Sequence, residues 1–151
     1  MQAISKQLES TSDLDIPPRS WAGVTSAAAR LTRELFPTGF VGLCLMDDSA
    51  IRNLNREHRG VDEATDVLSF VYRPDDAGEY LGEIALSWDA VQRQAKLNSN
   101  SLEAEAVALV THALLHIAGY DHLDSSQREA MDARTRRLCK LVGYEVKLFG
   151  H

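Results

Sequence analysis

Cysteine is scarce in this 151-residue sequence, and both cysteines, Cys44 and Cys139, fall within apolar stretches. Two cysteines do not build the disulfide framework of a small secreted domain, so we expect both to be reduced core thiols in a cytoplasmic protein. Long hydrophobic runs are also absent, since no apolar segment approaches the roughly 18 residues that a membrane-spanning helix needs. The N-terminal segment MQAISKQLES lacks the continuous hydrophobic stretch of a secretory signal. We therefore expect neither a membrane protein nor a disulfide-stapled secreted protein.

An excess of positive charge is missing as well, because the formal net charge is −6. This charge argues against a general basic coat for nucleic acids. It leaves room for a local basic cleft, because electrostatic steering depends on where the charges lie as well as on their sum. Hydrophobic residues make up 44% and charged residues 25% of the chain, which is ordinary for a soluble globular protein. The length predicts a single domain over residues 1–151 with one proper core.

Strand-like and helix-like segments alternate along the chain, which predicts a single α+β domain. We expect a mixed sheet of about four strands, at residues 2–9, 40–46, 66–72 and 81–87. About five helices pack against it, at residues 17–36, 47–59, 88–97, 102–118 and 124–141. Pro17 and Pro18 open the first helix, because proline is tolerated in a first turn. Gly60, Gly119 and Gly143 are placed to end three of the others.

The segment THALLHIAGYDH, residues 111–122, carries the clearest chemical signal. His112 and His116 are four positions apart on a predicted helix, so both imidazoles project from one face. Gly119 can adopt a left-handed conformation and turn the chain back, so that His122 returns to the same side. Three neutral imidazoles that leave a fourth position open to water form the ligand set of a catalytic zinc ion. The alternative is that His112 and His116 are hydrogen-bonded core residues and His122 is a loop residue.

The spacing H-x-x-x-H-x-x-G-x-x-H is also that of the metzincin proteases. Those enzymes need a glutamate directly after the first histidine as general base, and this sequence has Ala113 there. The metal frame is therefore present without the protease base, which argues against peptide hydrolysis by that mechanism. Asp121, beside His122, could orient a ligand, although an aspartate in a surface turn is an equal alternative.

Arginines form a basic stripe on the second predicted helix, because Arg52, Arg56 and Arg59 are spaced four and three apart. For Arg52 and Arg56 a solvated helix face is an equal interpretation. Arg59 differs, because it lies at the helix end, where a guanidinium could bind a phosphate and offset charge in a pentacoordinate transition state.

A second basic group lies in the last predicted helix and is diluted by Glu129 and Asp132; its members are Arg128, Arg134, Arg136, Arg137 and Lys140. A solvated helix face is the favoured interpretation of this group, with contact to RNA or to a ribosomal protein as the alternative. Met131 could pack beneath a metal site or simply belong to the core. No run of aromatic residues alternates with basic ones, so we expect no base-stacking platform.

The stretch HALLHIAGYDH resembles the signature of the bacterial YbeY family of zinc-dependent endoribonucleases, which act in ribosomal RNA maturation and ribosome quality control. LNREHRGVDEATDVLSF at 54–70 is similar to the family's segment with an arginine–glycine pair followed by T-D-V-L-S-F. LGEIALS at 81–87 resembles its L-G-D-I strand, and LVGY at 141–144 also fits. The resemblance covers about residues 40–145 and implies a zincin-like metal helix.

This resemblance implies that His112, His116 and His122 are metal ligands for one zinc ion (Zn2+) and that Arg59 is the functional arginine. It implies single-stranded RNA as substrate, in particular the 3′ end of precursor small-subunit (16S) ribosomal RNA. The ribosome would be the setting, with a small-subunit ribosomal protein or an assembly GTPase as partner, and neither membrane nor DNA is expected. The sequence departs from the family pattern at four positions, with less positive charge at the last two: Ala113 for glycine, His58 for tyrosine, and Val61 and Glu63 for residues that are often basic.

Two other functions stay open at this point. One is a zinc-bearing ribosome-assembly factor that cuts nothing, which the weak positive charge and the missing base favour. The other is a metallopeptidase with an unusual base. For a nuclease, the attacking group could be a zinc-bound hydroxide or the 2′-hydroxyl of the RNA, and the spacing fixes no carboxylate base. Nickel or another transition metal would bind the same imidazoles.

Overall fold

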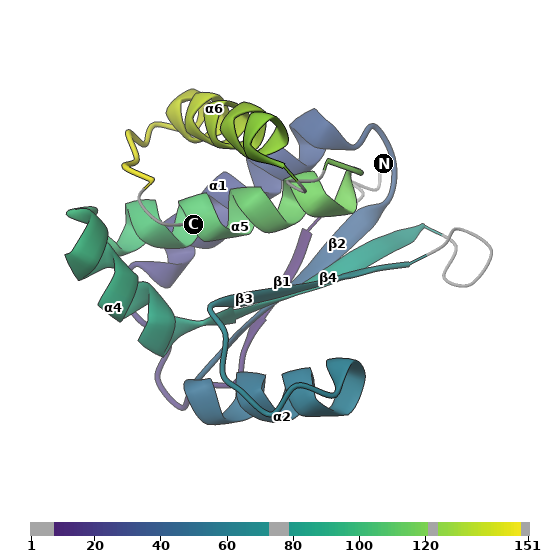
Figure 1. The fold of residues 1–151 in the computed structure, drawn as a ribbon, viewed down its shortest axis with the longest axis vertical. Coiled ribbons are helices and arrows are strands. Elements are labelled where there is room, and N and C mark those ends of the chain that lie inside the picture. Colours follow the sequence, from purple (N-terminus) through teal and green to yellow (C-terminus); the bar gives the residue numbers. More distant parts are fainter. Residues whose placement is uncertain (1–7, 73–78, 121–123, 149–151) are drawn as a thin grey trace, which may run out of the picture.

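The computed structural model describes residues 8–72, 79–120 and 124–148, which form a mixed four-stranded sheet with helices on both faces (Figure 1). The strands are β1 (Leu8–Ser12), β2 (Phe40–Met46), β3 (Val67–Val71) and β4 (Tyr80–Ser87). Their order across the sheet is β1-β2-β4-β3. β1, β2 and β4 are parallel, and the edge strand β3 runs antiparallel to β4. This arrangement confirms the expected fold class.

Five helices are described: α1 (Trp21–Leu35), α2 (Asp48–Arg59), α4 (Trp88–Asn98), α5 (Leu102–Ile117) and α6 (Ser125–Leu141). α5 runs across one face of the sheet and packs against β3, β4, α1, α4 and α6 (Figure 1). α2 covers the opposite face (Figure 1). α5 is therefore enclosed along most of its length, which explains its nearly continuous apolar sequence. Within the described ranges, no helix combines the length and hydrophobicity that crossing a lipid bilayer requires.

The core follows from the alternation of side chains in β2. Val41, Leu43 and Leu45 point to the α1–α5 face and are 0–2% exposed. Met46 points to the other face and packs with Ile51 of α2 in a smaller cluster. Both faces of the central strands are thus covered, and this burial explains why FVGLCLM reads as one apolar run.

The N-terminal region differs from the prediction. α1 begins at Trp21 rather than at Pro17, because the prolines precede a turn in which the Trp21 N–H donates to the Pro18 carbonyl (3.0 Å). The first strand was predicted at residues 2–9, of which 1–7 lie outside the described residues, and the described strand extends to Ser12. Its extent is set by parallel pairing with Val41–Leu45, which no local pattern reveals. All other predicted elements agree with the structure to within one residue at each end.

Both cysteines are free thiols. Cys139 of α6 is fully buried, and this burial raises the pKa of its thiol to about 11. Cys44 of β2 is partly buried, and desolvation raises its pKa as well. Both thiols are therefore neutral near pH 7. Cys139 lies in the core, as the sequence predicts, whereas Cys44 is only partly buried and packs against the smaller cluster.

Candidate functional site

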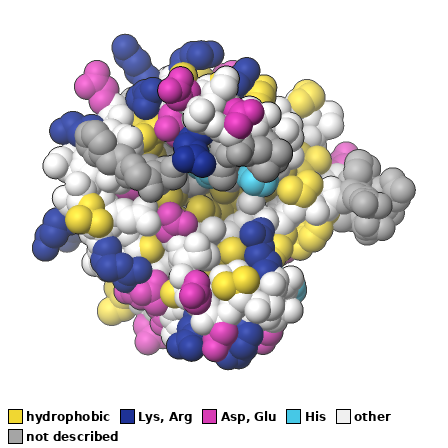
Figure 2. Space-filling view, in the orientation of Figure 1, with side chains coloured by type: hydrophobic (Ala, Val, Ile, Leu, Met, Phe, Trp, Pro, Cys, Tyr) yellow, Lys and Arg dark blue, Asp and Glu magenta, His cyan; other side chains and the backbone are white. Residues whose placement is uncertain are grey.

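α5 carries the two described histidines of the predicted metal centre. The helix begins at Leu102, where the Ser101 side chain accepts a hydrogen bond from the Ala104 N–H (3.1 Å). His112 and His116 lie one turn apart and are half-buried, whereas the three residues between them are buried. The two imidazoles therefore share the one side of this part of α5 that is not fully covered. Histidine atoms (cyan) are visible at the surface near the centre of Figure 2.

The chain turns sharply directly after His116. The Gly119 N–H donates to the His116 carbonyl (3.0 Å), and the Tyr120 N–H donates to the Leu115 carbonyl (3.0 Å). Gly119 has a φ of +101°, a conformation that side chains rarely adopt, so glycine is required for this turn. The turn ends α5 at this point, as the position of Gly119 predicts.

The third predicted ligand, His122, lies outside the described residues, as does Asp121. In the described part of the chain, no three side chains of metal-binding type form a cluster. Two imidazoles at this spacing are nevertheless two of the three donors that a zinc site of this kind needs, and the left-handed glycine supplies the turn that follows them. The described residues thus fit such a metal, and ligation by His112, His116 and His122 stays a prediction.

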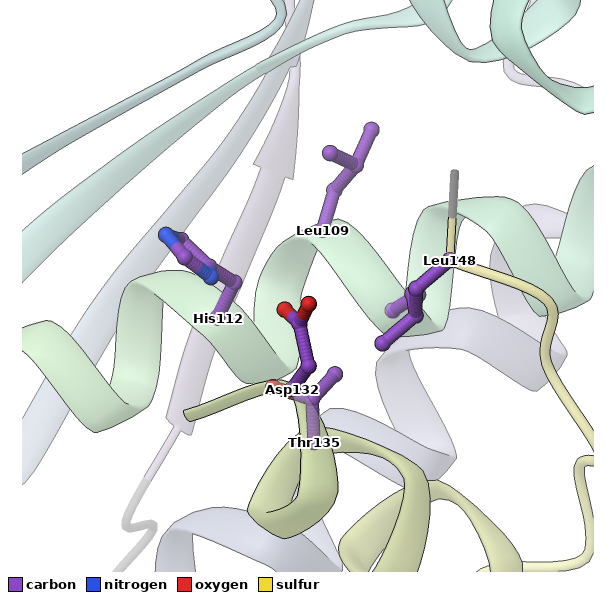
Figure 3. A pocket seen from close by; sticks show the side chains of 6 residues that line it. Leu109, His112, Asp132, Thr135 and Leu148 are labelled. Atoms are coloured by element: carbon purple, nitrogen blue, oxygen red, sulfur yellow. The ribbon is translucent and has the colours of Figure 1, made fainter. Parts of the chain in front are cut away.

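A carboxylate that the sequence analysis treated only as surface charge lies beside this centre. A cavity of about 10 Å³, just large enough for one water molecule, lies between the packed helices α5 and α6. Figure 3 shows the Asp132 carboxylate in this space, between His112 and Leu148. Asp132 is half-buried, and it adjoins the buried Met131 and Thr135 on the face of α6 that packs against α5. The helical periodicity of Met131 and Thr135 is the sequence signal that could have placed Asp132 on the side of α6 that faces α5.

Met131 is buried (1% exposed) and contributes to a second cavity, which Gly119 and Tyr120 also line. The residue therefore belongs to the core and also lies beside the turn that follows His116; its packing beneath a metal site stays a prediction.

Arg59 is the last residue of α2, and Gly60 ends the helix with a φ of +70°. One Nη2 N–H of Arg59 donates to the Ser69 carbonyl of β3 (2.8 Å). The guanidinium carbon lies 5.6 Å from the centre of the Phe70 ring. α5 packs against β3 from the other face of the sheet. Arg59 and the histidine helix therefore meet the same edge strand from its two sides.

The other two arginines of the basic stripe are bound to the loop that follows α2. Arg52 makes two hydrogen bonds to the Asp62 carboxylate (2.8 and 3.2 Å), and Arg56 lies 3.8 Å from the same carboxylate. The Arg52 guanidinium holds the pKa of Asp62 below its usual value. Among the described residues, only Arg59 of the three has no carboxylate partner. The stripe is thus partly neutralised, and its free charge is concentrated at the end of α2.

An ionic network fixes the other end of α2. The Asp48 carboxylate accepts hydrogen bonds from Arg93 of α4 (2.8 Å) and from the Ser87 hydroxyl (2.7 Å). The hydrogen bond from Arg93 and, to a smaller extent, the one from Ser87 hold the pKa of Asp48 below its usual value. The Asp48 N–H in turn donates to Asp89 (2.9 Å). α2 is therefore anchored to the β4–α4 junction, and this anchor helps to fix the direction in which Arg59 projects.

Known proteins resemble this chain over most of its length. A family model described as Endoribonuclease YbeY matches residues 9–143. A protein named Endoribonuclease YbeY from Roseiflexus sp. strain RS-1 is 39% identical, and the match covers 89% of this chain and 94% of that protein. Proteins of the same name occur in Erythrobacter litoralis (37% identity, 78% of this chain and 82% of that protein) and Wolinella succinogenes (51%, 54% and 58%).

The fold has a counterpart among solved structures. The solution structure of TM1509 from Thermotoga maritima matches with a TM-score of 0.65, over 89% of this chain and 88% of that one. At 24% sequence identity, this likeness concerns the fold alone. The family match, in contrast, spans Arg59 and both described histidines. On that match, and as its own motifs indicate, the chain belongs to the YbeY family.

Proposed function

We propose that this protein is a metal-dependent endoribonuclease that cleaves single-stranded RNA. The observation that carries the proposal is the pair His112 and His116, one turn apart on the half-buried face of α5 and followed by the left-handed Gly119. Its occurrence in a chain of a family named for endoribonuclease activity selects RNA among the possible substrates of a metal-dependent hydrolase.

His112, His116 and His122 would hold one zinc ion. The bound ion would polarise a phosphate oxygen and lower the pKa of a coordinated water. We assign Asp132 a positioning role, because imidazole ligands usually donate their second N–H to a carboxylate or carbonyl. Asp132 has the required location, since it shares a cavity with His112.

Arg59 would bind the phosphate whose bond is cleaved where the RNA crosses the β3 edge, because Arg59 of α2 and the helix α5 meet this strand from opposite faces of the sheet. Ser69 accepts from one of its N–H groups, so the guanidinium is held in place while other N–H groups stay available. An arginine oriented in this way can bind two phosphate oxygens at once and stabilise the additional charge of the transition state. Arg52 and Arg56 are unsuited to this role, because both are engaged by Asp62.

The finer substrate assignment rests on the resemblance to the family. We propose precursor 16S ribosomal RNA, cleaved near its 3′ end, as the substrate, and the ribosome in the cytoplasm as the setting. A small-subunit ribosomal protein or an assembly GTPase would be the protein partner. An open site at the edge of a sheet suits unpaired RNA, because a duplex requires contacts over a broader surface.

The test is cleavage of a labelled single-stranded RNA by wild type and by His116→Ala, with the bound metal quantified in both preparations. We expect the wild type to hold about one metal ion per chain and to cleave, and His116→Ala to lose both properties. His58→Ala is the matched control, because His58 is an exposed histidine of α2 that packs on Phe70 instead. If His116→Ala loses its metal while cleavage is unchanged, the cleavage comes from a contaminating nuclease and the proposal is wrong.

One observation favours a second function, that of a zinc-bearing ribosome-assembly factor without nuclease activity. Pairing of Arg52 and Arg56 with Asp62 removes positive charge that RNA cleavage would use. A variant without cleavage that still supports ribosome maturation in cells would indicate this function. A metallopeptidase is disfavoured, because Ala113 occupies the position of the protease base and is buried.

A further inference from the structure

A cavity of about 280 Å³ lies between the end of α5 and the first turns of α6. It is roughly twentyfold larger than the ~10–15 Å³ that one water molecule needs on the same measure, and it approaches the size of small-molecule sites. Its lining is mixed in character and comes from Gly119, Tyr120, Gln127, Ala130, Met131 and Arg134. The cavity can therefore accept a flat group of modest size with an apolar face and polar edges.

An aromatic ring and a cation are stacked in the wall of this cavity. The guanidinium carbon of Arg134 lies 4.5 Å from the centre of the Tyr120 ring. Tyr120 is 39% exposed, and Arg134 is half-buried on α6. In the described ranges, Arg134 makes no ion pair with a carboxylate. A partly exposed ring with a guanidinium fixed over it is a surface on which a further planar group can stack.

This cavity adjoins the candidate metal centre. Gly119, in its wall, donates its N–H to the His116 carbonyl, so Tyr120 begins within one turn of the predicted ligand. Met131 closes the cavity from the core side. Figure 2 shows Lys and Arg side chains, with some acidic ones between them, over the region of α6. A strand of RNA whose phosphate lies at the histidines would therefore pass close to Tyr120 and Arg134.

We propose that this cavity binds one base of the single-stranded RNA, which stacks on the Tyr120–Arg134 pair. The proposal rests on the proposed function and adds a base-binding subsite to it. Unpaired bases can leave the strand and stack on aromatic rings or guanidinium planes, whereas paired bases are held in the duplex. Stacking in this subsite would thus explain a preference for single-stranded RNA. The net charge of −6 does not explain such a preference.

The test compares two short labelled RNAs, one intact and one lacking a single base, with the abasic position moved along the strand. The affinities of wild type and Tyr120→Leu for these RNAs are measured by fluorescence anisotropy at low temperature, before cleavage products accumulate. We expect one position at which removal of the base weakens binding to the wild type by roughly 5- to 100-fold, as loss of one stacked base does. Tyr120→Leu weakens binding of the intact RNA by a similar factor and leaves binding of that abasic RNA unchanged.

Two further variants separate stacking from charge and from damage to the fold. Tyr120→Phe keeps the ring and restores the base dependence. Arg137→Ala removes an exposed charge from the same helix, and Arg137 lines none of the described cavities. We expect Arg137→Ala to weaken the binding of both RNAs by the same small factor. The proposal would be overturned if Tyr120→Leu weakened the binding of both RNAs equally, or did not weaken the binding of either.

Cleavage by the wild type distinguishes failure of the subsite from failure of the function. If the wild type cuts RNA and no base position depends on Tyr120, the subsite is wrong and the nuclease function stands. If the wild type neither binds nor cuts RNA, both proposals are wrong.

Discussion

Replacement of Arg59 separates its proposed catalytic role from its structural contacts. The structural cost is small, because the exposed side chain makes one hydrogen bond to the Ser69 carbonyl and one ring contact with Phe70. Such contacts contribute about 1–2 kcal/mol to the free energy of unfolding when they are exposed. Loss of a group that stabilises transition-state charge costs about 100- to 1000-fold in kcat, or about 3–4 kcal/mol. Arg59→Ala should therefore lower kcat far more than it lowers stability.

The assay pairs steady-state cleavage of a single-stranded RNA with urea denaturation of the same preparations. Arg59→Lys should recover only part of kcat, because lysine keeps the charge and loses the planar pair of donors. Arg52→Ala is the control: its ion pair with Asp62 is exposed, so we expect little loss of stability and little change in kcat. The reasoning is refuted if Arg59→Ala and Arg52→Ala lower kcat to the same extent.

Three other predictions follow from the contacts of the site and the sheet. Asp132→Asn should weaken metal binding by about 10- to 100-fold, measured by competition with a chelator, and unchanged affinity would contradict the positioning role. Arg93 lowers the pKa of Asp48. The contribution of Asp48 to stability is therefore present above about pH 4 and is lost as the pH falls through the lowered pKa. Asp48→Asn should remove this part of the pH dependence of stability, as measured by urea denaturation. Gly82→Ala should destabilise the protein by about 1–3 kcal/mol, because the added Cβ would lie 2.5 Å from a backbone carbonyl of β3, and an unchanged melting temperature would show that the strands can separate without cost.

The elements that local chemistry determines could be predicted from the sequence. The prediction of β2 is correct at both ends, because one face of FVGLCLM is buried and the other is partly covered, so that the strand reads as one apolar run. α2 was placed to within one residue, because the Asp47 side chain accepts from the Ala50 N–H at its start and Gly60 is left-handed at its end. The side-by-side placement of His112 and His116 likewise needs only a helical repeat.

The features that depend on contacts between distant segments could not be predicted. Asp62 folds back on Arg52 and Arg56 across the loop after α2, so the stripe is less basic than the spacing suggested. Asp132 lines the same cavity as His112 only because α6 packs against α5. The Tyr120–Arg134 pair joins a turn to a helix, and a search for alternating aromatic and basic residues does not detect it.

α5 is fixed at the end opposite the histidines, and this anchoring bears on how the proposed metal centre would form. Glu105 is completely buried, and its Oε1 accepts hydrogen bonds from the side-chain amides of Asn98 (3.0 Å) and Asn100 (2.9 Å). Asn100 also exchanges two hydrogen bonds with the backbone of Lys147 (2.9 Å each). A carboxylate is tolerated in such a place because it is hydrogen-bonded, and the network ties α5 to α4 and to the C-terminal segment.

Because this network holds the N-terminal end of α5 and the core encloses its sides, the helix has little freedom to rotate. The positions of His112 and His116 are therefore determined by packing before any metal binds. Sites on such rigid elements hold their ligands in a productive geometry at a lower entropic cost than sites on loops. Desolvating two imidazoles in the largely apolar C-terminal half of α5 costs free energy that leucine or alanine would not cost. This cost is readily understood if the two side chains serve chemistry, and the Gly119 turn, Asp132 and the Tyr120–Arg134 pair all gather at the same end of the helix.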